Sequence, residues 1–348
     1  MTANSNNPAV VTDERLVAKM GWLKAIPFLL GANRLMVGGL LLTACILTGC
    51  QKTETVALAW QQLPSGTDVK LNDVYFADSL NGQVVGGSTW FSGVQLQTND
   101  GGQRWSLDSI APAELNALDG SEPGFLLTTG IGGQLLAYQS RQGWGVAKLI
   151  PTAIHRDLAF NGPDRGVVVS GEAFQDGLIL TYGRDFELLS QDTFDNELNA
   201  VCFSDDSTVH VVGYGLVLRS ADGGLSWSAR QIDGDFFQSV CFPSANVGYA
   251  VGLFGTIIKT VDAGQTWTKQ RDGRKLGVSD VPFRSVFFVD EQKGYIVGDD
   301  QAFWRTENGG INWKAVKNPP PGDLQAVYVV DGKGFIVGSE GGIFTFND

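Results

Sequence analysis

Seven copies of a unit of roughly 40 residues predict an all-β fold, a seven-bladed β-propeller with four-stranded blades, closed by pairing of the N- and C-terminal segments. Three observations support this prediction. Each unit opens with a hexapeptide of alternating apolar residues and continues with a short β-branched run beside glycine. Four of the units then contain a turn motif of the form Ser/Thr-x-Asp/Asn-x-Gly-x-x-Trp.

The opening hexapeptides set the period of the repeat. They are LNDVYF at Leu71, LNALDG at Leu115, HRDLAF at His155, LNAVCF at Leu198, FQSVCF at Phe237, FRSVFF at Phe283 and LQAVYV at Leu324. Counted from the fourth residue of each, the spacing runs from 39 residues (Val201 to Val240) to 46 residues (Val240 to Val286). A propeller blade of four strands needs about 40 to 45 residues. Each opening is therefore expected to form the first strand of a blade.

The later strands of each unit follow in order. Runs such as GQVVGG, GVVVSG and GYIVG have the composition of second strands, and GLVLRS and GTIIKT that of third strands. The second and third units have QSRQGW and YGRDFE in place of the turn motif. The last unit ends at GGIFTFND, one strand short, while TVALAWQQLP precedes the first unit. The two ends are expected to complete one blade and leave no long unpaired edge.

The turn motif is the Asp box, found as TNDGGQRW, SADGGLSW, TVDAGQTW and TENGGINW. Its third residue is Asp100, Asp222, Asp262 or Asn308, which can accept hydrogen bonds from backbone amides while glycine supplies positive φ and tryptophan packs. A calcium loop needs several closely spaced oxygen ligands, and each box offers at most one acid at this position. A structural turn is favoured over a metal site.

Residues 1–50 are expected to form an N-terminal extension with a lipoprotein-type signal segment, and residues 51–348 the propeller. The apolar run Leu35–Leu47 follows Arg34 and is shorter than the roughly 20 residues of a transmembrane helix. The following LTGC resembles the lipobox of bacterial lipoproteins, which implies lipidation of Cys50. Gln51 does not match the inner-membrane retention signal, which implies the periplasmic side of the outer membrane. Met1 and Met20 both remain open as translation starts.

Charge and composition exclude several classes of function. The net charge is −12, and residues 1–50 carry two net positive charges, which leaves −14 for the rest. An acidic domain does not favour nucleic acid as a partner. His155 and His210 are the only histidines, so a zinc site has little support and no cofactor is expected. Cys202 and Cys241 occupy the same position in consecutive units, and we expect buried free thiols there rather than a bridge.

The second position of every opening hexapeptide is a long polar residue. These residues are Asn72, Asn116, Arg156, Asn199, Gln238, Arg284 and Gln325, and they are expected to ring one mouth of the central channel. A polar strand start beside a wet channel explains the Asn and Gln members. Arg156 and Arg284 are predicted to bind a partner.

The loops between second and third strands place aromatic rings at the same end. They carry Trp90, Phe174, Tyr214 and Phe254, and a nearby basic segment adds Arg271 and Arg274. Exposed aromatic residues on loops often bind partners. Two structural alternatives stay open: each ring can pack on the neighbouring blade, and a run of charges is usually a solvated loop.

Two known families share these motifs. Bacterial sialidases have Asp boxes and propellers, but their chemistry also needs three arginines, a Tyr/Glu pair and an acid/base Asp. This sequence has no RIP motif and only two arginines at the channel mouth, so a glycan-binding or glycan-hydrolysing propeller is the alternative function.

The segment FQSVCFPSANVGYAVGLFGTIIKTVDAGQTW is similar to the repeat of the photosystem II stability and assembly factor family. The resemblance implies a non-enzymatic propeller that holds newly made reaction-centre subunits through an arginine-bearing patch, served here by Arg156, Arg284, Arg271 and Arg274. We therefore expect a lipid-anchored extracytoplasmic scaffold that binds a membrane-protein complex or nascent membrane-protein segment. The compartment would be the thylakoid lumen in a photosynthetic organism.

Overall fold

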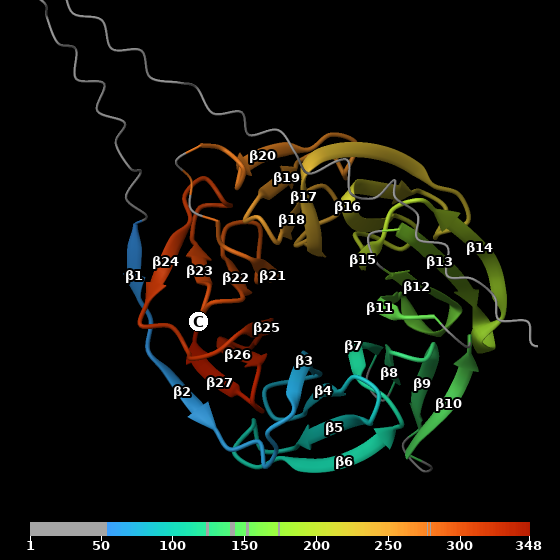
Figure 1. Ribbon diagram of the computed structural model, residues 1–348, viewed down its shortest axis with the longest axis horizontal. Coiled ribbons are helices and arrows are strands. Elements are labelled where there is room, and N and C mark those ends of the chain that lie inside the picture. The colour runs from blue at the N-terminus through green and yellow to red at the C-terminus, as the bar shows by residue number, and fades with distance from the viewer. Residues whose placement is uncertain are drawn as a thin grey trace, which may run out of the picture. The chain divides into compact units, whose positions relative to one another are not determined.

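The computed structural model describes residues 54–122, 125–139, 143–150, 153–172, 175–276, 278 and 280–348. They form an all-β propeller in which six hydrogen-bonded sheets stand around a ring (Figure 1). The expected signal segment and Cys50 lie outside the described residues. Within the described part of the chain, no helix has the length and apolar character needed to cross a membrane.

The first three sheets each correspond to one sequence unit, with the first strand at the centre of the ring and the fourth at the rim (Figure 1). The first contains β3 (Lys70–Phe76), β4 (Gly82–Ser88), β5 (Ser92–Thr98) and β6 (Ser106–Ala111). The second contains β7 (Leu115–Glu122), β8 (Phe125–Gly130), β9 (Gln134–Gln139) and β10 (Gly143–Leu149). The third contains β11 (His155–Phe160), β12 (Arg165–Glu172), β13 (Gln175–Gly183) and β14 (Leu188–Phe194), with short 3-10 turns at Gly162–Asp164 and Arg184–Phe186.

The fourth sheet has six strands and covers two sequence units. It contains β15 (Leu198–Phe203), β16 (Val209–Ser220), β17 (Ser228–Cys241), β18 (Gly248–Gly252), β19 (Ile257–Thr260) and β20 (Thr268–Arg271). The long strand β17 pairs with β16 near its start and with β18 near its end. It is therefore the last strand of one unit and the first of the next, and seven sequence units give six continuous sheets.

The last two sheets close the ring with N-terminal strands. The fifth contains β21 (Phe283–Phe288), β22 (Gly294–Gly298), β23 (Phe303–Thr306) and β24 (Lys314–Lys317); the sixth contains β25 (Leu324–Val330), β26 (Lys333–Gly338) and β27 (Ile343–Asn347). Strand β2 (Trp60–Leu63) pairs antiparallel with β27, and β1 (Thr55–Ala57) pairs parallel with β24. The predicted closure by the two ends is confirmed, and β1 is an addition that the repeat did not predict.

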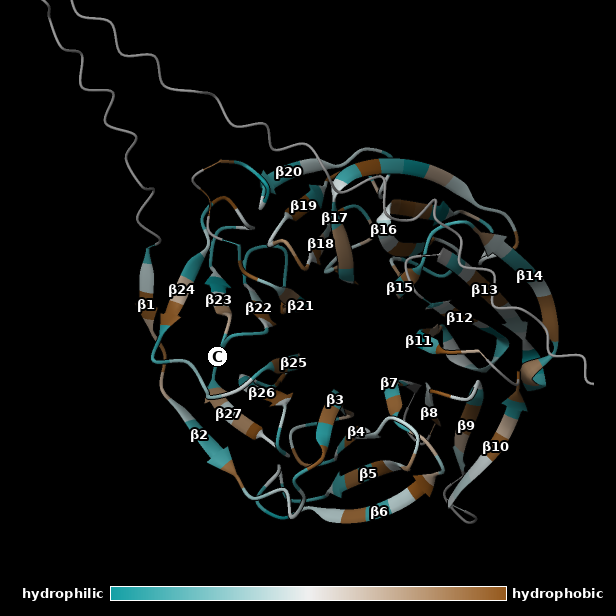
Figure 2. Cartoon of the chain, in the orientation of Figure 1, coloured by the Kyte–Doolittle hydropathy of each residue, from teal (hydrophilic) through white to brown (hydrophobic). Residues whose placement is uncertain are grey.

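Apolar side chains fill the space between neighbouring sheets. Every sheet carries hydrophobic residues on its strands (Figure 2), and rings stack across boundaries, as Phe76 does on Phe335 with 3.8 Å between centroids. The recurring glycine at the start of the second strand has a packing reason. A Cβ at Gly82 would lie 2.4 Å from the ring of Phe76, so only glycine lets that ring pack flat on the backbone.

Four Asp boxes turn the chain at one end of the ring, which we call the box end. Asp222 accepts hydrogen bonds from the amide of Ser226 at 2.9 Å and from the hydroxyl of Ser220 at 2.7 Å. The same two kinds of bond reach Asp100, Asp262 and Asn308. The hydroxyl of Ser226 is the main cause that lowers the pKa of Asp222 to about 2. In this geometry the carboxylate or amide oxygen closes a turn.

Three half-buried aspartates join successive first strands beside the channel. Asp73 accepts a hydrogen bond from the amide of Leu118 at 2.8 Å, and Asp157 from that of Val201 at 2.9 Å. Asp119 accepts one from the amide of Phe160 at 2.6 Å. Burial raises the pKa of Asp73 to about 7, of Asp119 to about 6 and of Asp157 to about 8. Each carboxylate bonds to a backbone amide of the next unit along the chain.

Two cysteines and two histidines also lie in the interior of the sheets. Cys202 and Cys241 are free thiols, half-buried rather than fully buried as expected, and burial raises the pKa of Cys241 to about 11. Burial lowers the pKa of His155 to about 4 and that of His210 to about 3. These histidines are neutral in the folded protein near neutral pH.

The third box generates a prediction about backbone strain. Ala263 has a φ of 56° at a position where the other boxes have glycine, and an L-residue in this region is strained. Ala263→Gly should raise the free energy of unfolding by about 0.5 to 1 kcal/mol, measured by denaturant titration. Gly264→Ala is the opposite control, because its Cβ would lie 2.4 Å from the ring of His210. Destabilisation by Ala263→Gly would contradict the prediction.

The side chains of Asp73, Asp119 and Asp157 should make the free energy of unfolding depend on pH. Their folded pKa values exceed the unfolded value of 3.8, so the folded state binds protons that the unfolded state releases, and stability falls as pH rises through 7 and 8. Below about pH 6.5 the unfolded histidines take up protons, which opposes the carboxylates and flattens the curve.

We expect the free energy of unfolding to be about 1 kcal/mol larger at pH 6.5 than at pH 8. Asp157→Asn should remove much of this difference, because it replaces the carboxyl whose pKa is raised most. Asp108→Asn, at an exposed position of β6, should keep it. Equal stability at the two pH values, or an unchanged slope in Asp157→Asn, would show that these carboxyls stay ionised.

Candidate functional site

The polar residues at the second position of the first strands bond to neighbouring units. Asn72 donates to the carbonyl of Leu115 at 2.8 Å, and Asn116 donates to the carbonyl of His155 at 2.7 Å. Asn199 donates to the carbonyl of Phe237 at 2.9 Å. Gln238 accepts a bond from Arg284, and Gln325 is half-buried. This geometry gives most of the set a role in holding the ring together.

Arg156 and Arg284 each have a carboxylate partner. Arg156 lies 2.8 Å from Glu197, whose side chain is buried, and also donates to the carbonyl of Gly171. Arg284 contacts both oxygens of Asp299, at 2.9 and 2.7 Å. About one third of each arginine side chain is exposed, 36% and 33%. A partner would therefore meet the outer edges of guanidinium groups that are already fixed in position.

Arg271 and Arg274 come from the same segment but occupy different environments. The guanidinium of Arg271 donates to the carbonyl of Gly255 and lies about 5.5 Å from the ring centroids of Phe283 and Trp304. Burial lowers the pKa of Arg271, and its contacts are those of a packed side chain. Arg274 is exposed, with its guanidinium carbon 4.4 Å above the ring of Phe254.

Three of the predicted residues line one pocket of about 210 Å³, which we call the loop pocket. Tyr214, Phe254 and Arg274 come from three different segments, and Gln231, Asp233 and Asp235 complete much of the wall. Tyr214 is 44% exposed and packs edge-to-face on Phe236. The pocket therefore combines two aromatic rings, a guanidinium and two carboxylates at one boundary between units.

Asp235 fixes the shape of the loop pocket. It is buried, and its carboxylate accepts hydrogen bonds from the amides of Phe254 at 2.9 Å and Thr256 at 2.8 Å. These bonds hold the loop that carries Phe254 in place before any ligand arrives. A preformed aromatic pocket with a few polar groups is the usual form of a binding site.

Trp90 lies apart, at the tip of the turn between β4 and β5. It is 64% exposed and its neighbour Phe91 is 86% exposed. The buried Glu114 orders this region, because its carboxylate accepts bonds from Thr89 at 3.0 Å and Asn72 at 2.8 Å and pairs with Lys70 at 2.7 Å. Phe174, the remaining predicted aromatic residue, lies outside the described residues.

Three buried acids, Glu114, Glu197 and Asp235, hold residues of the site in place and were not predicted from the sequence. Glu114 and Glu197 directly precede the first residue of an opening hexapeptide, and Asp235 lies two residues before one. An acidic residue one or two positions before an apolar first strand was the signal in the sequence that could have indicated them. Among the described residues no cluster of His, Cys, Asp or Glu has the geometry to hold a metal ion.

Residues 231–348 match the family model described as Photosynthesis system II assembly factor YCF48. The chain is also 32% identical over 108 residues to photosystem II stability/assembly factor HCF136, chloroplastic, from Arabidopsis thaliana, which covers 28% of this chain and 25% of that protein. The HCF136 protein of Oryza sativa subsp. japonica is 32% identical over 106 residues, with 28% and 24% covered. The matched segment spans about a quarter of the length of these curated relatives.

Solved structures share the fold over most of the chain. A structure titled YCF48 bound to D1 peptide has a TM-score of 0.64 at 15% identity, covering 85% of this chain and 97% of that one. YCF48 from Cyanidioschyzon merolae gives 0.64 at 16%, with 83% and 99% covered. The WD40 propeller domain of Doa1 also gives 0.64, at 14% identity, with 84% and 97% covered. The chain is thus a propeller similar to the photosystem II assembly factors, with the sequence similarity to their family model in residues 231–348.

Proposed function

We propose that the chain is a non-enzymatic scaffold, a seven-bladed propeller that holds a segment of a membrane protein in the manner of photosystem II assembly factors. The loop pocket is the observation that carries this proposal, because it joins Tyr214, Phe254 and Arg274 in one preformed hollow. The family match includes Phe254 and Arg274. The related structure titled YCF48 bound to D1 peptide supports a peptide as the kind of ligand.

The chemistry of the loop pocket suits an extended peptide. The rings of Tyr214 and Phe254 offer flat apolar surface at a low cost in conformational entropy. Arg274 lies over Phe254, and this stacking leaves the edges of the guanidinium available for peptide carbonyls or a carboxylate. Asp233 is exposed and can accept hydrogen bonds from the backbone amides of the peptide.

Arg156 and Arg284 would extend this surface toward the channel mouth. Both guanidinium groups are held by carboxylates, Glu197 and Asp299, which reduces the entropy lost when a partner binds. Their ion pairs also reduce the net positive charge that they offer. We therefore assign the larger share of binding to the loop pocket and a secondary share to the two arginines.

Lipid anchoring at Cys50 and an extracytoplasmic location complete the proposal. They rest on the lipobox-like LTGC and on the apolar run before it. Strand β1 begins at Thr55, so a lipid on Cys50 would be separated from the propeller by only a few residues. Such an anchor would keep the scaffold beside newly inserted membrane proteins.

Binding of the membrane-protein partner should depend on the loop pocket. Phe254→Ala combined with Arg274→Gln should lower the recovery of a crosslinked membrane-protein complex about tenfold or more, because the loop pocket then loses one aromatic ring and its guanidinium. Arg156→Ala with Arg284→Ala should lower it less. Leu276→Ala, a fully exposed position in the same segment, is the matched control. Unchanged recovery with the Phe254 and Arg274 variant would remove the site assignment.

Membrane association should depend on Cys50. Cys50→Ser should abolish metabolic incorporation of labelled fatty acid and should move the protein from the membrane fraction to the soluble fraction, because the acylated thiol is lost. Cys45→Ser is the control and should change neither result. Membrane association of the Cys50 variant without a label would contradict lipid anchoring but would leave the loop pocket untouched.

A further inference from the structure

A basic residue directly before an Asp box reaches into the next unit along the ring. Arg219 donates to the carbonyl of Ala263, the fourth residue of the next box, at 2.8 Å. Lys259 donates to the carbonyl of Gly309, again the fourth box residue, at 2.8 Å. A charged side chain thus binds a peptide carbonyl of the next box at two consecutive boundaries.

Arg305 occupies the same place before the fourth box but meets a different neighbour. The last sheet takes its fourth strand, β2, from the N-terminal side, so no box turn connects β27 to it. The hydroxyl of Tyr295 and the ammonium of Lys293 both contact the carboxylate of Asp348 instead. Arg305 lies against the ring of Tyr295, and its Nε has no hydrogen-bond partner among the described residues.

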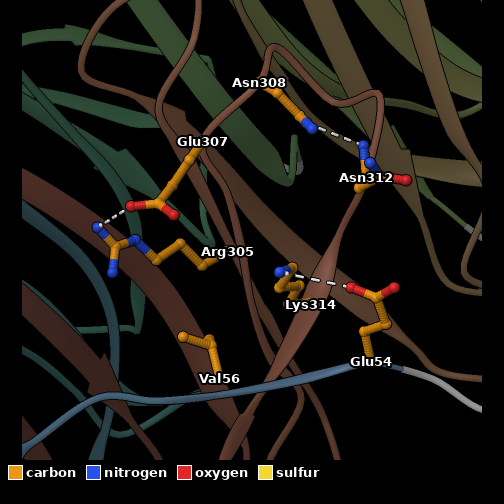
Figure 3. A pocket seen from close by; sticks show the side chains of 7 residues that line it. All are labelled: Glu54, Val56, Arg305, Glu307, Asn308, Asn312 and Lys314. Atoms are coloured by element: carbon orange, nitrogen blue, oxygen red, sulfur yellow. Dashed lines mark hydrogen bonds and ion pairs between the residues drawn. The ribbon is translucent and has the colours of Figure 1, made fainter.

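A pocket of about 190 Å³ lies beside Arg305 on the fifth sheet, and we call it the seam pocket. Its lining is Glu54, Val56, Arg305, Glu307, Asn308, Asn312 and Lys314 (Figure 3). At the earlier boundary the hollow beside Arg219 is lined by Gly264 and Gln265 of the next box. In the seam pocket Glu54 and Val56, from the start of the N-terminal strand, line the wall instead.

The two cations of the seam pocket are paired with exposed acids. Arg305 lies 2.8 Å from Glu307, and Lys314 lies 3.4 Å from Glu54 (Figure 3). The side chains of Glu307 and Glu54 are 66% and 70% exposed, whereas that of Arg305 is only 16% exposed. The pair of Lys314 and Glu54 is exposed on both sides and contributes little free energy, so an incoming carboxylate can replace Glu54 there and compete with the exposed Glu307 for Arg305.

We propose that the seam pocket is a second peptide site, which binds the carboxylate of an acidic residue in an extended partner segment. Arg305 supplies a planar guanidinium that can pair with a carboxylate through two parallel hydrogen bonds. Lys314 supplies a second positive charge, and the amides of Asn308 and Asn312 line the same wall. The site lies at the box end and does not depend on the loop pocket.

Two other cations of this chain and strand β1 favour a peptide as the ligand of the seam pocket. The two equivalent cations of this chain bind peptide carbonyls, and β1 shows that the rim of this sheet accepts an added extended strand. A carboxylate carries a negative charge, so a hydrogen bond from a guanidinium to it is stronger than one to a peptide carbonyl.

Calorimetric titration of the full chain at low salt tests the proposal with acetyl-Ala-Ala-Asp-Ala-Ala-amide and its counterpart with Asn in place of Asp. The Asp peptide should bind about tenfold or more tightly than the Asn peptide. Arg305→Gln should abolish that preference. Glu307→Gln should strengthen binding of the Asp peptide, because it removes the competing carboxylate.

Arg219→Gln is the matched control for folding. It should lower the melting temperature through loss of the bond to Ala263, yet retain the preference for Asp. Equal binding of the two peptides, or no heat from either at millimolar concentration, would overturn the proposal. A preference for Asp that survives in Arg305→Gln would overturn it as well.

Discussion

The structure depends on one constraint: each repeat unit exposes two apolar faces and can bury them only against its neighbours in a closed ring. Closure requires β2 to pair with β27, so the N-terminal and C-terminal strands depend on each other. Polar contacts recur at several boundaries: asparagines at the channel mouth, aspartates beside the channel, and Arg219 and Lys259 at the boxes. All of them join one unit to the next.

The same constraint explains where binding surfaces arise. Boundaries between units leave hollows, and the loops that meet there differ from unit to unit, whereas the strands keep a common apolar pattern. In the loop pocket the boundary carries two aromatic rings and a guanidinium, fixed by the buried Asp235. In the seam pocket the repeat is interrupted by ring closure, and among the described residues Arg305 has no bond to a box carbonyl of the kind that Arg219 and Lys259 make.

Much of the fold could be predicted from the sequence because the repeat fixes strand order and spacing. The period located every first strand. Because the last unit supplies only three strands of its own, the sequence also predicted closure by the N-terminal segment. The pairing of β1 with β24 could not be predicted, since three residues carry no repeat signal. For the site, loop sequences indicated Tyr214, Phe254 and Arg274. The burial of Arg271 and the role of Asp235 depend on contacts between units that no local pattern reveals.

The loop pocket is proposed to hold a segment of a membrane protein. The most direct measurement is site-specific photocrosslinking in cells, with a photoreactive amino acid in place of Tyr214, followed by mass spectrometry of the crosslinked peptides. We expect crosslinks to one defined membrane-protein segment. The same probe in place of Leu107, exposed on β6 at the rim, should give none of them. If the probe at position 214 crosslinks no membrane protein, or if both positions give an identical set of crosslinks, the loop pocket does not bind a membrane-protein segment.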